Sequence, residues 1–174
     1  MEFTRIMLDK LNNEVLLSRL KERFVDTILN TDEPYGLLTI EVGKDQIIEV
    51  LEFLKKDVEL QFIYLTDITA VHYPERDLSI GVVYHLHSFV NKLRIRLKVF
   101  INGENPEIPS ATVLWKGANW MERETYDFYG VRFLGHPDLN RILNVDDMEV
   151  FPMRKEYPLE DPNRVDKKDY FFGR

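Results

Sequence analysis

The stretch KLRIRLKVFI, residues 92–101, is the clearest strand signal in the chain, because apolar and charged side chains alternate along most of it. Leucine, isoleucine and valine occupy every second position, and the positions between them carry cations as far as Lys98, with Phe100 after them. Successive side chains of a strand point to opposite faces of a sheet, so the pattern predicts a strand with one apolar and one charged face. The charged face consists of Lys92, Arg94, Arg96 and Lys98. Such a face usually contacts only solvent. The alternative is that it binds an acidic surface of a partner protein.

Further strand-like runs lie before this stretch. Residues 62–73 and 79–87 are rich in β-branched and aromatic residues, and short polar turns separate them from each other and from residues 92–101. Short connections of this kind predict antiparallel hairpins. Residues 37–42 also alternate apolar and polar side chains, and residues 25–29 read as a short strand before a turn at 31–36.

Two amphipathic helices accompany these strands. The first covers residues 13–24 with Asn13 as its N-cap, and the second covers residues 44–55 with apolar residues at helical spacing. Two such helices can cover one face of a sheet. We therefore expect an α+β fold with two helices packed on a mostly antiparallel or mixed sheet, then a short C-terminal helix and an extended C-terminal arm. The expected domains are an α+β sandwich at 1–117, a helix and Gly-His-Pro turn at 118–145, and the arm at 146–174.

The bulk composition narrows the classes of function. The chain has 174 residues, a formal net charge of −7 and no cysteine. An acidic protein has no general attraction for phosphate backbones, so a nucleic-acid partner is not expected. The absence of cysteine excludes disulfides and thiolate-ligated zinc or iron–sulfur clusters. We expect neither a signal peptide nor a membrane span, because no sufficiently long apolar stretch occurs.

The most informative stretch is NWMERETYDFYG, residues 119–130, which predicts a short helix with both ends marked. Asn119 is a good N-cap, and Glu122 three positions later completes a capping-box pattern. Gly130 stands where a helix end favours a residue at positive φ. Trp120, Glu124 and the aromatic residue at 128 recur at every fourth position, so Glu124 falls on what reads as the apolar stripe.

Two carboxylates in this helix lack a local explanation. A carboxylate on an apolar stripe is costly unless it is paired, and Asp127 lies near the helix C-terminus, where the macrodipole disfavours negative charge. We therefore expect Glu124 and Asp127 to take cationic or donor partners from elsewhere, which is typical of functional or interface sites. A solvated helix with ordinary surface charges remains the alternative.

Other candidate residues are better explained by structural roles. His85 and His87 could share a metal, but no third ligand is evident. No nucleophile lies near His136, so a turn or interface role is favoured over general-base catalysis. The carboxylates of the helix could form an acid/base pair, although an ion-pair network with Arg123 is the simpler interpretation. The chain contains no dinucleotide, phosphate-loop or His-Glu-x-x-His motif.

The segment after residue 146 is polar and interrupted by prolines, so it predicts an arm that lies along a partner. A frayed terminus is the alternative. Its scattered apolar anchors are Phe151, Met153, Tyr157, Leu159, Tyr170, Phe171 and Phe172.

Several of these motifs in order resemble a known family. The run WMERETYDFYG at 120–130 is followed by GHPDL at 135–139, RIL at 141–143 and PMRKEYPL at 152–159. This order resembles the signature of the C subunit of NADH-quinone oxidoreductase, the 30 kDa subunit family of respiratory complex I. The sequence departs from the family pattern at Asn140, where a second arginine is usual, and at Phe151, where a histidine is common.

The resemblance implies a non-catalytic structural subunit in the peripheral arm of proton-translocating NADH:quinone oxidoreductase. It implies a position on the cytoplasmic face of the bacterial inner membrane, reached only through partners. No flavin or cluster is expected in this chain, whereas FMN and iron–sulfur clusters are expected in partner subunits. The implied partners are the large quinone-site subunit and the cluster-carrying subunits. The implied interface or structural-network residues are Glu122, Arg123, Glu124, Asp127, Gly130, His136, Pro137, Arg141, Arg154, Lys155 and Tyr157.

Two other functions remain open. A related subunit occurs in membrane-bound hydrogenases and other oxidoreductases of this lineage, so the electron donor could differ. A free-standing acid/base hydrolase using Glu122 and Glu124 is the alternative from another class, although no nucleophile is recognisable.

Overall fold

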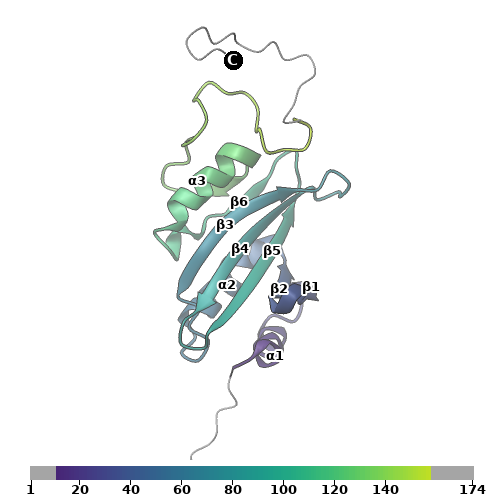
Figure 1. The fold of residues 1–174 in the computed structure, drawn as a ribbon, viewed down its shortest axis with the longest axis vertical. Helices are drawn as coiled ribbons and strands as arrows, with labels where there is room; N and C mark the ends of the chain where they lie inside the picture. The colour runs from purple at the N-terminus through teal and green to yellow at the C-terminus, as the bar shows by residue number, and fades with distance from the viewer. Residues whose placement is uncertain (1–10, 158–174) are drawn as a thin grey trace, which may run out of the picture.

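The computed structural model describes residues 11–157 and confirms the α+β class. A five-stranded sheet forms its centre, in the order β1-β2-β5-β4-β3 (Figure 1). The strands are β1 (Ile28–Asp32), β2 (Leu38–Val42), β3 (Tyr64–His72), β4 (Ile80–Ser88) and β5 (Leu93–Ile101). Strands β3, β4 and β5 form the antiparallel meander that their short connections predict. The sheet is mixed because β2 pairs in parallel with β5.

Helices α1 (Asn13–Arg23) and α2 (Ile47–Lys56) account for the two predicted amphipathic helices. Figure 1 shows α2 behind the sheet. The N-cap of α1 is Asn12 rather than Asn13, because the Asn12 side chain accepts the backbone N–H of Val15. A short 3₁₀ turn, Lys44–Gln46, precedes α2.

The strand predicted at residues 25–29 exists, but it begins three residues later than expected, at Ile28. Residues 25–27 form a turn, and β1 extends through residues that we expected to lie in the following turn. Pairing with β2 explains this result, since Thr31 lies opposite Ile40 and Asp32 opposite Thr39. A partner strand therefore outweighs the weak strand propensity of asparagine and aspartate.

The sheet has one buried and one open face. Leu97 of β5 lies between Tyr84 of β4 and Ile40 of β2 in the strand register, and all three are almost fully buried. The strictly alternating stretch thus behaves as predicted: its apolar side chains enter the core, while Arg94 on the opposite face is exposed. The core side chains of this buried face are Leu38, Ile40, Ile68, Val82, Tyr84, Leu86, Ile95, Leu97 and Val99.

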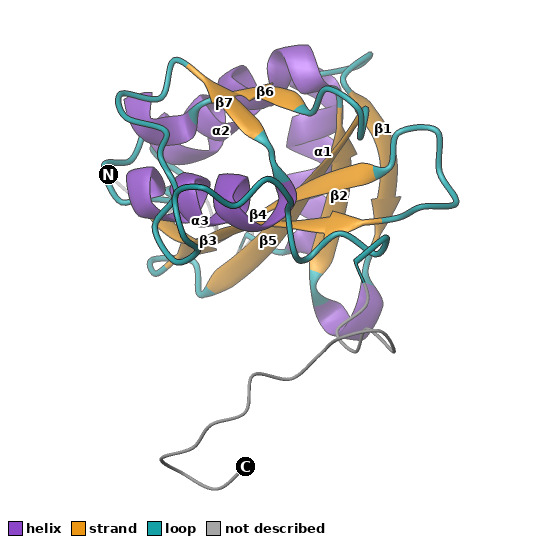
Figure 2. Ribbon diagram, turned by 90° about the horizontal axis from the view of Figure 1, so that it is seen from above, coloured by secondary structure: helices purple, strands orange, loops and turns teal. Residues whose placement is uncertain are grey.

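The C-terminal third adds a helix and a small second sheet. Helix α3 (Ala118–Tyr129) packs against β3, and Ala118 joins the common core. Strand β6 (Glu107–Pro109) pairs in parallel with β7 (Arg132–Leu134), apart from the main sheet (Figure 2). Two further 3₁₀ turns are Pro34–Gly36 and Ala111–Val113.

Residues 146–157 of the expected arm are described, and they run as loops and turns over the end of α3. The anchors expected at Leu159, Tyr170, Phe171 and Phe172 lie outside the described residues. Within residues 11–157, no helix has both the length and the apolar character needed to cross a bilayer.

Candidate functional site

Asp127 is the centre of a hydrogen-bonded network at the C-terminal end of α3. Its carboxylate is fully buried and accepts the backbone N–H groups of Ile142, Leu143 and Asn144 at 3.1, 2.8 and 2.9 Å. It also accepts the Asn144 side-chain amide at 3.1 Å and Nη1 of Arg141 at 2.8 Å. The partners that Asp127 was expected to need therefore come from a loop about fifteen residues further along the chain.

The electrostatics of Asp127 follow from these donors. Burial by itself would raise the pKa of the carboxyl group. The backbone N–H groups of Asn144 and Leu143, with the Arg141 guanidinium, outweigh burial and hold the pKa well below its usual range. Asp127 is consequently ionised at neutral pH and fixes residues 141–144 to the helix.

Arg141 extends this network toward the C-terminal segment. Its guanidinium donates to the Asp127 backbone carbonyl at 2.9 Å and to the carbonyls of Met148 and Val150 at 2.6 and 3.1 Å. Its side chain is only 9% exposed. The planar fork of arginine can reach several acceptors at once, which a lysine could not do in this position.

Two guanidinium groups lie near the Phe151 ring. Arg141 and Arg154 lie 5.1 and 5.2 Å from its ring centroid, and the Tyr126 ring meets it edge-on at 6.0 Å. Arg154 also donates to the carbonyls of Tyr129 at 2.8 Å and Gly103 at 3.1 Å. The departure from the family pattern at Phe151 therefore supplies an aromatic platform for cations instead of a titratable group.

Gly130 is the residue that lets this segment approach. It ends α3 in the left-handed region at φ 77°. A Cβ atom at this position would lie 2.5 Å from the Phe151 ring. Glycine is therefore required both for the backbone conformation and for the space.

Arg123 fastens the preceding loop to the middle of α3. Its Nε and Nη2 each donate at 3.1 Å, to the carbonyls of Asn140 and Arg141. Its guanidinium also lies 5.0 Å from the Trp120 ring centroid. Arg123 thus pairs with backbone carbonyls rather than with the carboxylates of its own helix.

The expected capping box of Asn119 and Glu122 is wrong. The N-cap position of α3 is Gly117, without a side-chain cap. Glu122 points into the core instead, where it accepts Ser110 Oγ and the Ala111 backbone N–H, each at 2.6 Å. Burial raises its pKa to about 7, although these two donors act in the opposite direction.

The apolar stripe expected along α3 is also wrong. Glu124 is exposed and Trp120 is 62% exposed, so their side of the helix faces away from the core. The buried side carries Ala118, Glu122 and Thr125, and Thr125 Oγ1 donates to the Ile68 carbonyl of β3 at 3.2 Å. The buried side of α3 carries polar residues whose hydrogen-bond partners lie elsewhere in the fold. The spacing of apolar residues therefore did not identify this side as the buried one.

The remaining predicted residues brace the loops around α3. His136 Nδ1 accepts the Asp138 N–H at 3.0 Å and Nε2 lies 3.1 Å from the Asn119 carbonyl, so Nε2 carries the proton. Pro137 follows in the same turn. The backbone N–H of Lys155 donates to His72 Nδ1 at 2.9 Å, and that of Tyr157 donates to the Arg154 carbonyl at 3.0 Å.

Sequence reasoning missed several members of this site. Ser110 and the Ala111 N–H hold Glu122, Asn144 holds Asp127, and His72 holds the segment at Lys155. Of these residues, only Ser110 could have been noticed in the sequence, because serine is a common helix N-cap. Backbone N–H donors leave no mark in a sequence. Within residues 11–157, no group of three or more His, Asp or Glu side chains could hold a metal ion.

A family model described as "Respiratory-chain NADH dehydrogenase, 30 Kd subunit" matches residues 40–163, which include the whole sheet meander and the α3 network. The chain belongs to this family. The resemblance stated from the motifs is thereby confirmed. The family match covers most of the chain rather than the signature alone.

Curated relatives agree with this assignment. The C subunit of NADH-quinone oxidoreductase from Citrifermentans bemidjiense is 46% identical over 153 residues, covering 88% of this chain and 93% of the relative. The protein of the same name from a Roseiflexus species is 46% identical over 149 residues, covering 86% of each.

Two solved structures share the fold. A trypsin-resistant fragment of Nqo5 superposes with a TM-score of 0.62 at 30% identity, covering 71% of this chain and 98% of the fragment. A chain of an archaeal membrane-bound sulfane sulfur reductase superposes with a TM-score of 0.70 at 23% identity, covering 90% of this chain and 98% of that one. The second comparison shows the fold alone.

Proposed function

We propose that this family member is a structural subunit of the peripheral arm of an NADH–quinone oxidoreductase. The observation that carries the proposal is the family match, together with relatives named as the C subunit of that enzyme at 46% identity over most of the chain. The chain would work by holding neighbouring subunits in register, so that distances between redox centres stay constant. The finer assignment is to a proton-translocating enzyme at the cytoplasmic face of a bacterial inner membrane.

The chain itself is proposed to carry no cofactor and no catalytic residue. Without cysteine it has no thiolate to ligate a cluster, so FMN and iron–sulfur clusters would reside in partner subunits. The hydrolase alternative loses its geometric basis because Glu122 is buried against Ser110 while Glu124 is exposed. Two carboxylates on different sides of a helix cannot act on one substrate.

The surface proposed to meet the large quinone-site subunit lies on α3 and the loop that Asp127 holds. Trp120, Leu143 and Val145 are 62%, 63% and 62% exposed there. We call these three residues the α3–loop surface. Large apolar side chains on a rigid, hydrogen-bonded support are typical of sites that bind another protein. The network around Asp127 would fix this surface before the partner arrives.

Affinity purification of the tagged chain from gently solubilised native membranes tests the proposal. We expect recovery of a large quinone-site subunit, cysteine-rich cluster proteins and an NADH-binding flavoprotein. A nickel-binding large subunit without the flavoprotein would instead indicate a hydrogenase, and a chain recovered alone would refute the proposal.

Truncation variants test the surface itself. Replacing Trp120, Leu143 and Val145 together by alanine should lower recovery of the large subunit about tenfold or more, because central aromatic and aliphatic anchors carry most of an interface's energy. The matched control replaces Val25, Leu29 and Val58, which are also exposed, by alanine. Equal recovery from the two triple variants would exclude the α3–loop surface as the contact.

A further inference from the structure

The open face of the sheet carries an ordered array of side chains that the proposed function does not use. The register places Arg94 opposite His87, Arg96 opposite His85 and Lys98 opposite Val83. These residues, with Tyr64 and Asp67 of β3 on the same side, form what we call the outer sheet face. Helices α1 and α2 cover the other face, and on this one Arg94 is exposed while Arg96 and Lys98 are half-buried.

The cations of β5 form no ion pair in the part of the chain that the structure describes. Among residues 11–157, no carboxylate lies within 4.0 Å of Arg94, Arg96 or Lys98. Arg96 Nε donates a hydrogen bond to Thr39 Oγ1, at 3.0 Å. The chain as a whole has a net charge of −7, so this face has the opposite sign to the molecule that carries it.

The same cations repel one another. Burial lowers the pKa of Lys98, and the nearby Arg96 and Arg76 lower it further, although Asp32 and Glu41 act in the opposite direction. Burial also lowers the pKa of His85, helped by Arg96 and Lys98 and opposed by Asp67. The positive charges therefore outweigh the acidic neighbours, and an incoming carboxylate would relieve the repulsion.

An aromatic cluster borders one end of this face. Phe89 is 53% exposed, and its ring centroid lies 4.6 Å from that of His87 and 5.3 Å from that of Tyr64. A hollow of about 510 Å³ lies beside it and is lined in part by His85 and Arg94. A smaller hollow of about 160 Å³ lies at the far end and is lined in part by Lys98. Arginine and exposed aromatic side chains together are enriched in protein interfaces.

We propose that the outer sheet face docks an extended acidic segment of another subunit, with its carboxylates over Arg94, Arg96 and Lys98 and an apolar side chain against Phe89. Alternate residues of an extended chain are about 7 Å apart, and Arg94 to Lys98 spans about 14 Å. A segment with carboxylates at every second position therefore matches all three cations. The inference rests on the proposed function, since it takes the occupant from the same complex.

Site-specific photo-cross-linking tests the occupant directly. The photoreactive amino acid p-benzoyl-phenylalanine replaces Phe89 in the tagged chain, and the complex is irradiated in native membranes and then purified. We expect a cross-linked peptide of another subunit with carboxylates at alternating positions. The control places the same amino acid at Val25, which is exposed at the end of α1 and should not label that peptide.

Other cross-linking results would overturn the inference. These are no adduct in an otherwise complete complex, an adduct to lipid, an adduct to a second copy of this chain, or a peptide without acidic residues. Loss of the whole complex from the wild-type purification would instead refute the proposed function. The failures of the two proposals are thus distinguishable.

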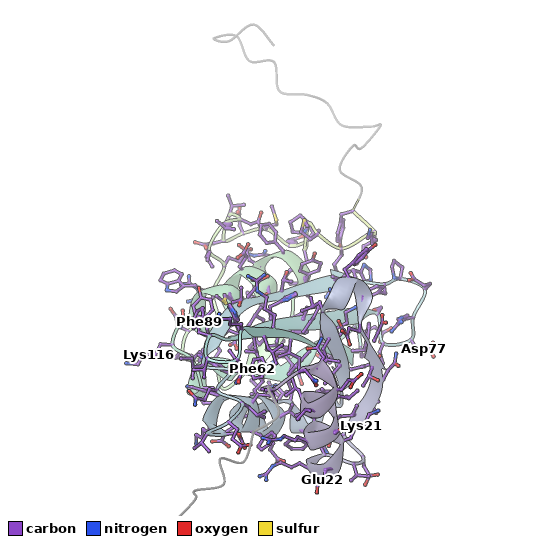
Figure 3. All side chains as sticks on the ribbon, turned by 60° about the horizontal axis from the view of Figure 1, so that its bottom comes forward. Lys21, Glu22, Phe62, Asp77, Phe89 and Lys116 are labelled. Carbon is purple, nitrogen blue, oxygen red and sulfur yellow. The ribbon has the colours of Figure 1, made fainter. Side chains whose placement is uncertain are left out.

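Charge reversal provides a second measurement. The double variant Arg94→Glu and Lys98→Glu should lower recovery of the cross-linked subunit about tenfold or more, because like charges brought together cost several kcal/mol. The control, Lys21→Glu and Lys44→Glu, makes the same change in net charge on exposed positions elsewhere. Figure 3 shows Lys21 and Phe89 on different sides of the molecule. Equal recovery from both variants would overturn the inference, provided that each has the circular dichroism spectrum of the wild type. If the charge-reversal variant does not fold, the cross-linking result decides.

Discussion

Replacing Asp127 by asparagine should destabilise the C-terminal third of the fold more than any other isosteric change in α3. The buried carboxylate accepts three backbone N–H groups, one side-chain amide and the guanidinium of Arg141, which is only 9% exposed. Asparagine keeps one acceptor oxygen but points an NH₂ group at these donors and leaves Arg141 without its anion. Breaking a buried pair from one side costs about 3–5 kcal/mol.

Hydrogen exchange of the full-length chain measures this loss where it occurs. The amide protons of Ile142, Leu143 and Asn144 are the ones that Asp127 binds, so their exchange reports local opening of the loop. A loss of about 3–5 kcal/mol corresponds to exchange roughly 150- to 5,000-fold faster. Urea unfolding followed by circular dichroism gives the accompanying change in global stability.

The pH dependence supplies a second test of the same reasoning. Because the folded state lowers the pKa of Asp127, the stability that its carboxylate contributes is present above the unfolded pKa of about 4 and is lost as pH falls below it. The difference between wild type and the asparagine variant should therefore shrink between about pH 5 and pH 2. The control Asp77→Asn, at an exposed position, should change stability by about 0.5 kcal/mol or less. If the three amides exchange at wild-type rates in Asp127→Asn, the account of the network is incorrect.

Two further substitutions probe the remaining features of α3. Burial raises the pKa of Glu122 from 4.5 to about 7, so the folded state binds this proton more tightly and stability falls as pH rises through that window. Glu122→Gln cannot titrate; its free energy of unfolding relative to wild type should rise by about 3 kcal/mol from pH 4.5 to pH 8, and parallel pH curves would contradict the prediction. Gly130→Ala should cost about 2–4 kcal/mol in urea unfolding, because it adds a contact with Phe151 to the strain of positive φ. Gly36→Ala, at φ 75° with nothing near its Cβ, isolates the strain alone, and an equal cost in both variants would exclude the steric contribution.

The alternation of apolar and polar residues predicted most of the sheet, because the face to which a strand side chain points depends only on its position along the strand. Each side chain of residues 92–101 is directed to one face by the geometry of an extended strand, and burial of one face then follows from hydrophobicity. The same reasoning located both amphipathic helices, with α2 beginning as a 3₁₀ turn at Lys44. It failed at residues 30–32, which continue as strand through their pairing with β2.

The candidate site was harder to predict because its contacts are distant in sequence. Glu122 resembles a capping residue until Ser110 and Ala111 are brought to it across a loop. Glu124 resembles a buried charge until the packing of α3 on β3 turns it outward. The departure at Phe151 could be noticed from the motif, but the two guanidinium groups near its ring could not be predicted.

The class of fold, the alternating character of β5 and, through ordered motifs, the family could all be inferred from the amino-acid sequence. The sequence also showed that Asp127 sits where a helix disfavours an anion. Which side of α3 is buried and which groups neutralise Asp127 became clear from the folded chain alone. The physical reason is that the donors are mostly backbone N–H groups of residues 142–144, which every sequence possesses and which become a binding site only when the chain folds back over the end of the helix.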